Sequence, residues 1–141
     1  MQISPYLSFN GQCEAAFRFY EQRVGGKIVA MLTYGNSPAA EQCAADMHGK
    51  IMHARLILDG QTLMGSDSPH GRYEETRGMS VALGIDNPEK AEWIFSALAE
   101  NGTIQMPIQE TFWAHRFGML VDQFGIPWMI NCERTDNKPG A

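Results

Sequence analysis

The chain has 141 residues, of which 44% are hydrophobic and 19% are charged, and its formal net charge is −5. This length and composition are typical of one folded globular domain and argue against a disordered chain. The acidic charge, with no run of basic residues, argues against nucleic-acid binding, and no apolar stretch is long enough to span a membrane. Three cysteines without CxxC spacing indicate reduced thiols. We therefore expect a cytoplasmic protein with no nucleic-acid or membrane partner.

The first half of the chain is predicted to form a strand, a helix and three further strands. A helix over 12–23 carries an apolar face and ends at Gly25-Gly26, where glycine tolerates a positive φ. The Asp59-Gly60 pair between two apolar segments predicts a hairpin. The predicted strands are 3–9, 27–34, 51–58 and 61–66, and the longest loop, rich in Gly, Ala, Pro and Ser, is 35–50.

The second half predicts the same order of elements. Asn87-Pro88 starts a helix with proline in its first turn, and Asn101-Gly102 ends it. The predicted strands are 79–85, 103–106, 113–121 and 127–133, with a loop at 107–112 and a turn at 122–125. A polar linker at 68–77 separates two modules, at about 1–67 and 78–133, and a polar tail follows at 134–141.

An internal repeat fixes the predicted architecture. Residues 9–28 align without a gap with residues 85–104, which places Phe17 opposite Trp93, Phe19 opposite Phe95 and Gly26 opposite Gly102. A repeat of this size indicates duplication of one small αβ unit. We expect one α+β domain of two tandem β-α-β-β-β modules, in which each helix covers one face of a curved mixed sheet. The opposite faces would then border a groove for a small-molecule ligand, and their apolar surface favours a homodimer.

Three segments carry a family resemblance that covers nearly the whole chain. They are SPYLSFNGQCEAAFRFY (4–20), KIMHARLILDGQTLMGSD (50–67) and QETFWAHRFGMLVDQFGIPWMINCE (109–133). With the paired modules, they resemble the PhnB-like family of the vicinal oxygen chelate superfamily, which includes glyoxalases, bleomycin-resistance proteins and dioxygenases. Some PhnB-like proteins carry a label as ubiquinone-related methyltransferases. The sequence does not support that label, because no glycine-rich loop joins a strand to a helix in a unit that would hold S-adenosylmethionine.

The resemblance also implies where a metal would bind. Enzymes of the superfamily place His, Gln or Glu ligands at matching points on four strands. Here those points fall at Pro5, near Gly65, near Ser80 and at Met129. None of these side chains supplies the carboxylate oxygen or imidazole nitrogen that divalent cations prefer. We therefore expect no metal at the usual place and no other cofactor.

Two strand histidines and a nearby carboxylate are the candidate catalytic residues. His53 alternates with Arg55 on one strand, and His115 lies in the strand 113–121. Each histidine could act as a general base, or the two could hold a relocated divalent metal with Glu110 or Glu133. Each could equally be a hydrogen-bonded structural histidine.

The candidate ligand-binding residues are polar, aromatic or thioether side chains. Trp113 and Phe117 could stack on a flat ligand or belong to the core. Gln109 could orient a ligand or cap a loop. Met129 belongs to a methionine-rich set that suits an adaptable apolar pocket, and Arg55 or Arg116 would have to contact an anionic group.

Two functions therefore remain open at this point. One is a metal-free protein that binds a small organic molecule. The other is a metal-dependent lyase, isomerase or dioxygenase whose centre has moved to His53 and His115. The sequence does not decide whether the protein is an enzyme. A third interpretation is a scaffold domain with a filled groove.

Overall fold

The computed structural model describes residues 1–134, which form two compact units. Unit 1 comprises Met1–Glu75 and unit 2 begins at Thr76, so the division falls near the end of the predicted linker 68–77. Residues 135–141, which make up most of the predicted polar tail, lie outside the described residues. No helix in the described part of the chain is long and apolar enough to cross a membrane.

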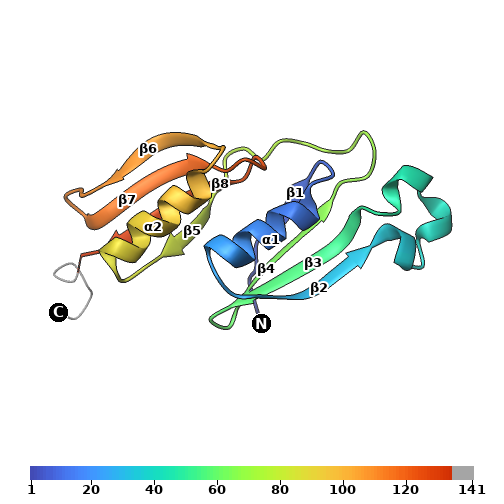
Figure 1. Cartoon of the computed structure of the whole chain (residues 1–141), viewed down its shortest axis with the longest axis horizontal. Coiled ribbons are helices and arrows are strands. Elements are labelled where there is room, and N and C mark those ends of the chain that lie inside the picture. Colours follow the sequence, from blue (N-terminus) through green and yellow to red (C-terminus); the bar gives the residue numbers. More distant parts are fainter. Residues whose placement is uncertain (135–141) are drawn as a thin grey trace. The chain divides into compact units, whose positions relative to one another are not determined.

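Unit 1 is a four-stranded mixed sheet with one helix on it (Figure 1). Its elements are β1 (Tyr6–Phe9), α1 (Cys13–Arg23), β2 (Lys27–Thr33), β3 (Ile51–Leu58) and β4 (Gln61–Asp67). The strand order is β1-β4-β3-β2, with β1 parallel to β4 and the other pairs antiparallel. The predicted long loop contains three short 3-10 helices, Tyr34–Asn36, Ala40–Gln42 and Ala45–Met47.

Unit 2 repeats this topology. Its elements are β5 (Val81–Gly84), α2 (Pro88–Ala99), β6 (Thr103–Gln109), β7 (Ala114–Val121) and β8 (Pro127–Glu133). The strand order is β5-β8-β7-β6, again with one parallel pair at the β5 side. The structure thus confirms the predicted α+β fold of two tandem β-α-β-β-β modules.

The helix faces that pack on the sheets show that the gapless repeat alignment is wrong within the helices. Phe17 is fully buried in α1, but Trp93, its predicted counterpart, is 59% exposed. A Cβ atom built on Gly65 would lie 2.8 Å from Phe17 Cε1, and one built on Gly118 would lie 2.6 Å from Phe95 Cε2. The two glycines lie on strands that do not correspond, β4 and β7, but the buried positions of the two helices have the same spacing, with Phe95 of α2 at the place of Phe17 of α1. The gapless alignment matches identical residue types, whereas the buried faces follow the position of each helix over its sheet.

Three predicted strand boundaries differ from the structure by two residues or more. Strand β1 begins at Tyr6 rather than at residue 3, since Ile3 is 96% exposed and gains no burial. Strand β5 begins at Val81 rather than at residue 79. Strand β6 continues to Gln109, through part of the predicted loop 107–112. It tolerates Pro107 because β6 is an edge strand with an irregular register.

Each unit contains one buried, hydrogen-bonded aspartate. Asp67 accepts hydrogen bonds from the backbone N–H groups of Cys13 (2.9 Å) and Ile51 (2.8 Å). Gln12, the residue before α1, makes no capping hydrogen bond, so Asp67 caps the helix from β4. In unit 2, Asp122 accepts hydrogen bonds from backbone N–H groups of its own turn and from Trp128 Nε1 (2.9 Å). These two carboxylates are structural.

Candidate functional site

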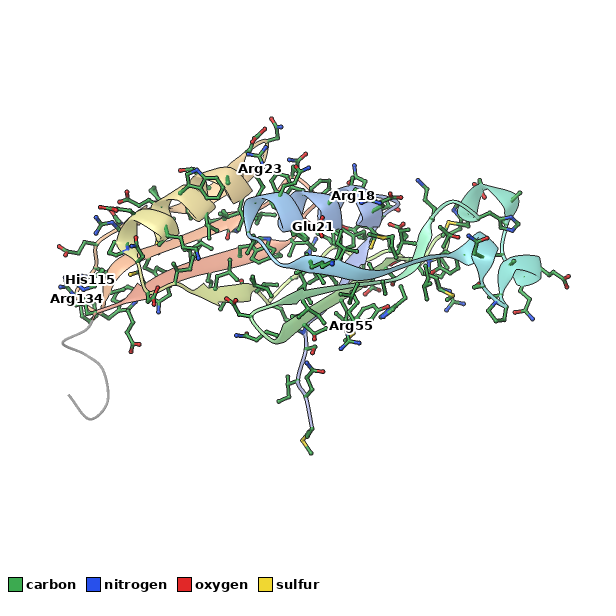
Figure 2. The ribbon with its side chains drawn as sticks, turned by 60° about the horizontal axis from the view of Figure 1, so that its bottom comes forward. Arg18, Glu21, Arg23, Arg55, His115 and Arg134 are labelled. Atoms are coloured by element: carbon green, nitrogen blue, oxygen red, sulfur yellow. The ribbon has the colours of Figure 1, made fainter. Side chains whose placement is uncertain are left out.

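In each unit, we call the sheet face opposite the helix the open face. The two open faces carry most of the predicted site residues. In unit 1, Gly65 faces α1, so its neighbour Met64 and the register partners of Met64 face away from the helix. Figure 2 shows Arg55 on the side of the sheet opposite to α1, which carries Arg18 and Glu21. In unit 2, Gly118 faces α2, so Met119 and its partners lie on the open face.

One row of register partners crosses all four strands of unit 1. This arginine row consists of Tyr6, Met64, Arg55 and Ala30. The Nε atom of Arg55 is shielded from solvent and has no hydrogen-bond partner among residues 1–134. The next open-face row contains the pairs Leu32–His53 and Ser8–Ser66.

Tyr6 and His53 form a polar pair beside Arg55. The Tyr6 hydroxyl and His53 Nδ1 lie 3.1 Å apart, and the two rings stack with centroids 5.8 Å apart. His53 is two residues before Arg55 on β3, so both side chains leave the same face. The structure thus places two predicted site residues, His53 and Arg55, side by side.

The corresponding row of unit 2 has a different chemical character. This methionine row consists of Ala82, Met129, Met119 and Met106. The neighbouring open-face positions include Phe117, paired with Asn131 and Gln109, and Gly84, which also pairs with Asn131. The side-chain oxygen of Asn131 is buried and has no partner in the described part of the chain.

An aromatic cluster adjoins the methionine row. The Trp113 ring lies 5.4 Å from the Phe117 ring and 4.8 Å from the Phe112 ring, measured between centroids. Trp113 is 41% exposed and precedes β7 rather than opening it. Phe117, Met129 and Gln109 therefore lie together on or beside the open face, with Trp113 at its end.

His115 lies between Trp113 and Phe117 in the sequence but does not continue their cluster. The register between β7 and β8 shifts between Ala114 and Arg116, which places His115 at a β-bulge. Figure 2 shows His115 and Arg134 at the same end of unit 2. Arg134 forms an ion pair with Glu110 at 3.2 Å, and Glu110 is largely exposed. His115 and Glu110 thus belong to the polar end of the unit.

The positions at which superfamily enzymes hold a metal carry other chemistry here. Gly65 faces α1, and the open-face residues of the strand pairs are Tyr6 with Met64 and Ala82 with Met129. A phenol, two thioethers and a methyl group do not form a site for a divalent cation. Among residues 1–134 no group of three or more His, Cys, Asp or Glu side chains could hold a metal ion. His53 belongs to unit 1 and His115 to unit 2, and a metal shared by them stays a prediction.

A hollow of unit 1 lies on the helix side rather than on the open face. It has a volume of about 410 Å³ and lies at the start of α1, between Gly11, Arg18 and Lys50. Lys50 Nζ donates to the backbone oxygen of Gly11 (3.1 Å), and Arg18 pairs with Glu14 (2.9 Å). Its charged groups are thus already paired.

Three open-face residues, Tyr6, Met119 and Asn131, were not among the predicted site residues. Two of them alternate with a predicted site residue: Met119 with Phe117, and Asn131 with Met129. Tyr6 stands beside Pro5, the position at which superfamily enzymes carry a metal ligand, but its pairing with His53 depends on contacts between β1 and β3 across β4.

Comparisons with known proteins agree with this fold. Residues 1–131 match the family model described as 3-demethylubiquinone-9 3-methyltransferase. The chain is 37% identical to Protein YjdN of Escherichia coli (strain K12), over 93% of this chain and 95% of that protein. The crystal structure of protein PA1353 from Pseudomonas aeruginosa is 50% identical, with a TM-score of 0.86, over 94% of this chain and 98% of that one.

A second solved structure carries the PhnB name. A putative 3-demethylubiquinone-9 3-methyltransferase, PhnB protein, from Bacillus cereus is 28% identical, with a TM-score of 0.78, over 94% and 99% of the two chains. A glyoxylase/bleomycin resistance protein/dioxygenase domain from Frankia sp. EAN1pec is 14% identical, with a TM-score of 0.62, over 94% and 95%. The last likeness shows the fold alone.

Proposed function

The chain belongs to the family described as 3-demethylubiquinone-9 3-methyltransferase, which includes PhnB-like proteins of the glyoxalase/bleomycin-resistance fold, and we propose that it binds a small organic molecule. The ligand lies on the open faces of the sheets. No divalent metal takes part at the positions that superfamily enzymes use.

The observation that carries this proposal is the position of the unpaired polar atoms. Native proteins leave few buried polar atoms without a partner, and those that remain call for an explanation. Within residues 1–134 the buried side-chain atoms of this kind are Arg55 Nε and Asn131 Oδ1. Both lie on open faces, one in each unit. A bound ligand with an acceptor or a donor would pair with them.

The residues around these atoms support binding of an organic molecule. Methionine side chains adapt their shape to an apolar partner, and aromatic rings stack on flat groups. The methionine row and the Trp113–Phe117 pair supply both kinds of contact on unit 2.

The family description names a methyltransferase, but the residues do not fit S-adenosylmethionine. A Rossmann-type cofactor site needs a glycine-rich turn between a strand and a helix, with free N–H groups at the helix start. Here the turn between β1 and α1 contains Gly11 as its single glycine, and the Asp67 carboxylate already occupies the Cys13 N–H group. We assign no methyl-transfer step to the chain.

The relocated metal centre remains the competing function. His53 Nδ1 is engaged with the Tyr6 hydroxyl, which leaves Nε2 as the nitrogen that could bind a metal. One imidazole nitrogen is a weak site for a divalent cation, so other ligands would have to join it.

Elemental analysis and a binding measurement separate the two functions. Protein purified without a metal-affinity tag is analysed for Zn, Ni, Mn and Fe, and binding of 1-anilinonaphthalene-8-sulfonate is followed by fluorescence with and without EDTA. We expect no stoichiometric metal and saturable binding that EDTA does not change. Met129→Glu should weaken this binding, because it places a carboxylate in the methionine row. Ser96→Glu, on the exposed side of α2, is the matched control.

Stoichiometric metal that is lost in His53→Ala would contradict the proposal and favour the relocated centre. Binding that both glutamate variants reduce equally would show that the probe does not use the open face of unit 2.

The predicted homodimer and cytoplasmic location belong to the same proposal. Exposed apolar side chains on the edge strand β6, Ile104 (51%) and Met106 (36%), support association with a second copy. Sedimentation equilibrium should give twice the chain mass, and a monomer mass would exclude the dimer.

A further inference from the structure

Resting on the proposed open-face binding, we propose that Arg55, with Tyr6 and His53 beside it, forms an anion-binding site on unit 1 that takes the carboxylate or phosphoryl group of the ligand. The site is specific to unit 1, since Met119 and Phe117 occupy the corresponding positions in unit 2.

The guanidinium of Arg55 differs from the other arginines whose contacts the structure describes. Several arginines are engaged by the chain itself: Arg18 with Glu14, Arg116 with Glu92, Arg134 with Glu110, and Arg23 over the Phe19 ring. Arg55 has no hydrogen bond or ion pair among residues 1–134, and its Nε is shielded from water. A guanidinium stays charged at all ordinary pH values, so this donor keeps its need for an acceptor.

The rows of unit 1 that hold Arg55 and His53 carry no acceptor of opposite charge. The row partners of Arg55 are Ala30, Met64 and Tyr6. The adjacent open-face row holds Leu32, His53, Ser8 and Ser66. Neither row carries a carboxylate, so an anion arriving from solution would meet a cation that the protein has not neutralised. Carboxylate and phosphoryl groups present paired oxygens that match the fork of a guanidinium.

The Tyr6–His53 pair adds a second hydrogen-bond donor, whether the Tyr6 hydroxyl or His53 Nδ1 donates in the bond between them. If the Tyr6 hydroxyl donates to Nδ1, the neutral His53 ring carries its hydrogen on Nε2 and can donate there. If Nδ1–H donates to the Tyr6 oxygen, the hydroxyl hydrogen remains free to donate. In both arrangements the pair keeps one donor for a ligand oxygen close to Arg55.

The test uses three small probes that share a phenyl ring. Benzoate carries a carboxylate, phenylphosphonate carries a phosphoryl group, and benzyl alcohol is neutral. Affinities are measured by NMR titration of the wild type, Arg55→Met, Arg55→Lys and Arg18→Met. Arg55→Met gives unit 1 the residue type of unit 2, and Arg18→Met removes the same charge from the exposed surface of α1.

We expect Arg55→Met to lower the affinity for at least one of the two anions about tenfold or more and to leave the affinity for benzyl alcohol unchanged. Arg55→Lys keeps the charge but loses the fork, so its loss should be smaller. The anion that binds the wild type more tightly identifies the group that the site prefers. Arg18→Met should bind all three probes as the wild type does.

Equal loss of anion affinity in Arg55→Met and Arg18→Met would overturn the assignment, since net charge alone would then explain binding. Unchanged anion affinity in Arg55→Met would also overturn it and would leave the proposed function standing. If none of the probes binds the wild type, both proposals fail. Should Arg55→Met not fold, the Arg55 Nε–H signal of the wild type decides: it must shift with an anion and not with benzyl alcohol.

Discussion

The two units share a topology and an aromatic contact between helix and sheet, but their open faces differ. On the helix-facing sides, Phe17 packs over Gly65 in unit 1 and Phe95 packs over Gly118 in unit 2. On the open faces, an arginine row in unit 1 corresponds to a methionine row in unit 2. Each unit thus packs an aromatic side chain of its helix against a sheet glycine, but the glycine lies on a different strand in each unit, and the open faces carry different side chains.

This difference has a physical reason. A side chain larger than glycine at residue 65 or 118 would collide with an aromatic ring and backbone atoms, so close packing restricts these positions. Arg55 and Met119 lie on the sheet face away from the helix of their own unit, so helix packing does not restrict the side chain at either position. The open faces therefore carry different chemistry, with an arginine row in one unit and a methionine row in the other.

The largest expected effect tests whether Phe17 and Phe95 are equivalent. Phe95→Ala and Phe17→Ala should each lower the free energy of unfolding by about 4 kcal/mol, because each leaves a cavity in a core. Trp93→Ala should cost less than about 1 kcal/mol, because Trp93 is 59% exposed. Urea unfolding measures all three. A larger loss in Trp93→Ala than in Phe95→Ala would restore the gapless repeat alignment.

A smaller effect is expected from the buried aspartates, one in each unit. Asp67→Ala leaves the N–H groups of Cys13 and Ile51 without their acceptor and should cost about 3 kcal/mol. Asp122→Ala should cost a similar amount, since it also removes the partner of Trp128. Thermal and urea unfolding provide the values. Asp46→Ala, on the exposed surface, should change stability little, and an equal loss there would show that Asp67 has no special role.

The smallest expected effect is a difference in cysteine reactivity between the two units. Burial, reinforced by the nearby Asp67 carboxylate, raises the pKa of the Cys13 thiol, and burial raises that of Cys132. Cys43 is half-buried. A thiol reagent at pH 8 should therefore label Cys43 in unit 1 and leave unit 2 unlabelled, and Cys43→Ser should abolish rapid labelling. Rapid labelling of Cys132 would contradict its burial.

The raised thiol pKa values also determine how the free energy of unfolding changes with pH. A thiol that stays protonated in the folded chain and ionises in the unfolded chain stabilises the unfolded state above its ordinary pKa. The free energy of unfolding should therefore decline as the pH rises above about 9. Cys13→Ala should reduce this decline. An unchanged slope in that variant would assign the decline to other groups.

The fold was more predictable from sequence than the site. Strands 51–58 and 127–133 have the predicted bounds, because alternation and turn residues are local signals. The gapless repeat alignment wrongly matches the buried Phe17 with Trp93. Trp93 and Phe95 are both apolar and aromatic, and only packing on the sheet decides which of them is buried. Of the arginine row, only Arg55 was proposed as a site residue. The contact of Tyr6 with His53 joins residues from strands separated by β4, and no local pattern encodes it.

The most direct test of the difference between the two open faces uses the methionines as probes. Spectra of ¹³C-methyl methionine protein are recorded with benzoate and, separately, with indole. We predict that benzoate shifts the methyl signal of Met64 most and that indole shifts the methyl signals of Met119 and Met129 most. Met47, buried away from the open faces, should not move. Shifts confined to Met47, or the same set of methyl shifts with both probes, would contradict the account.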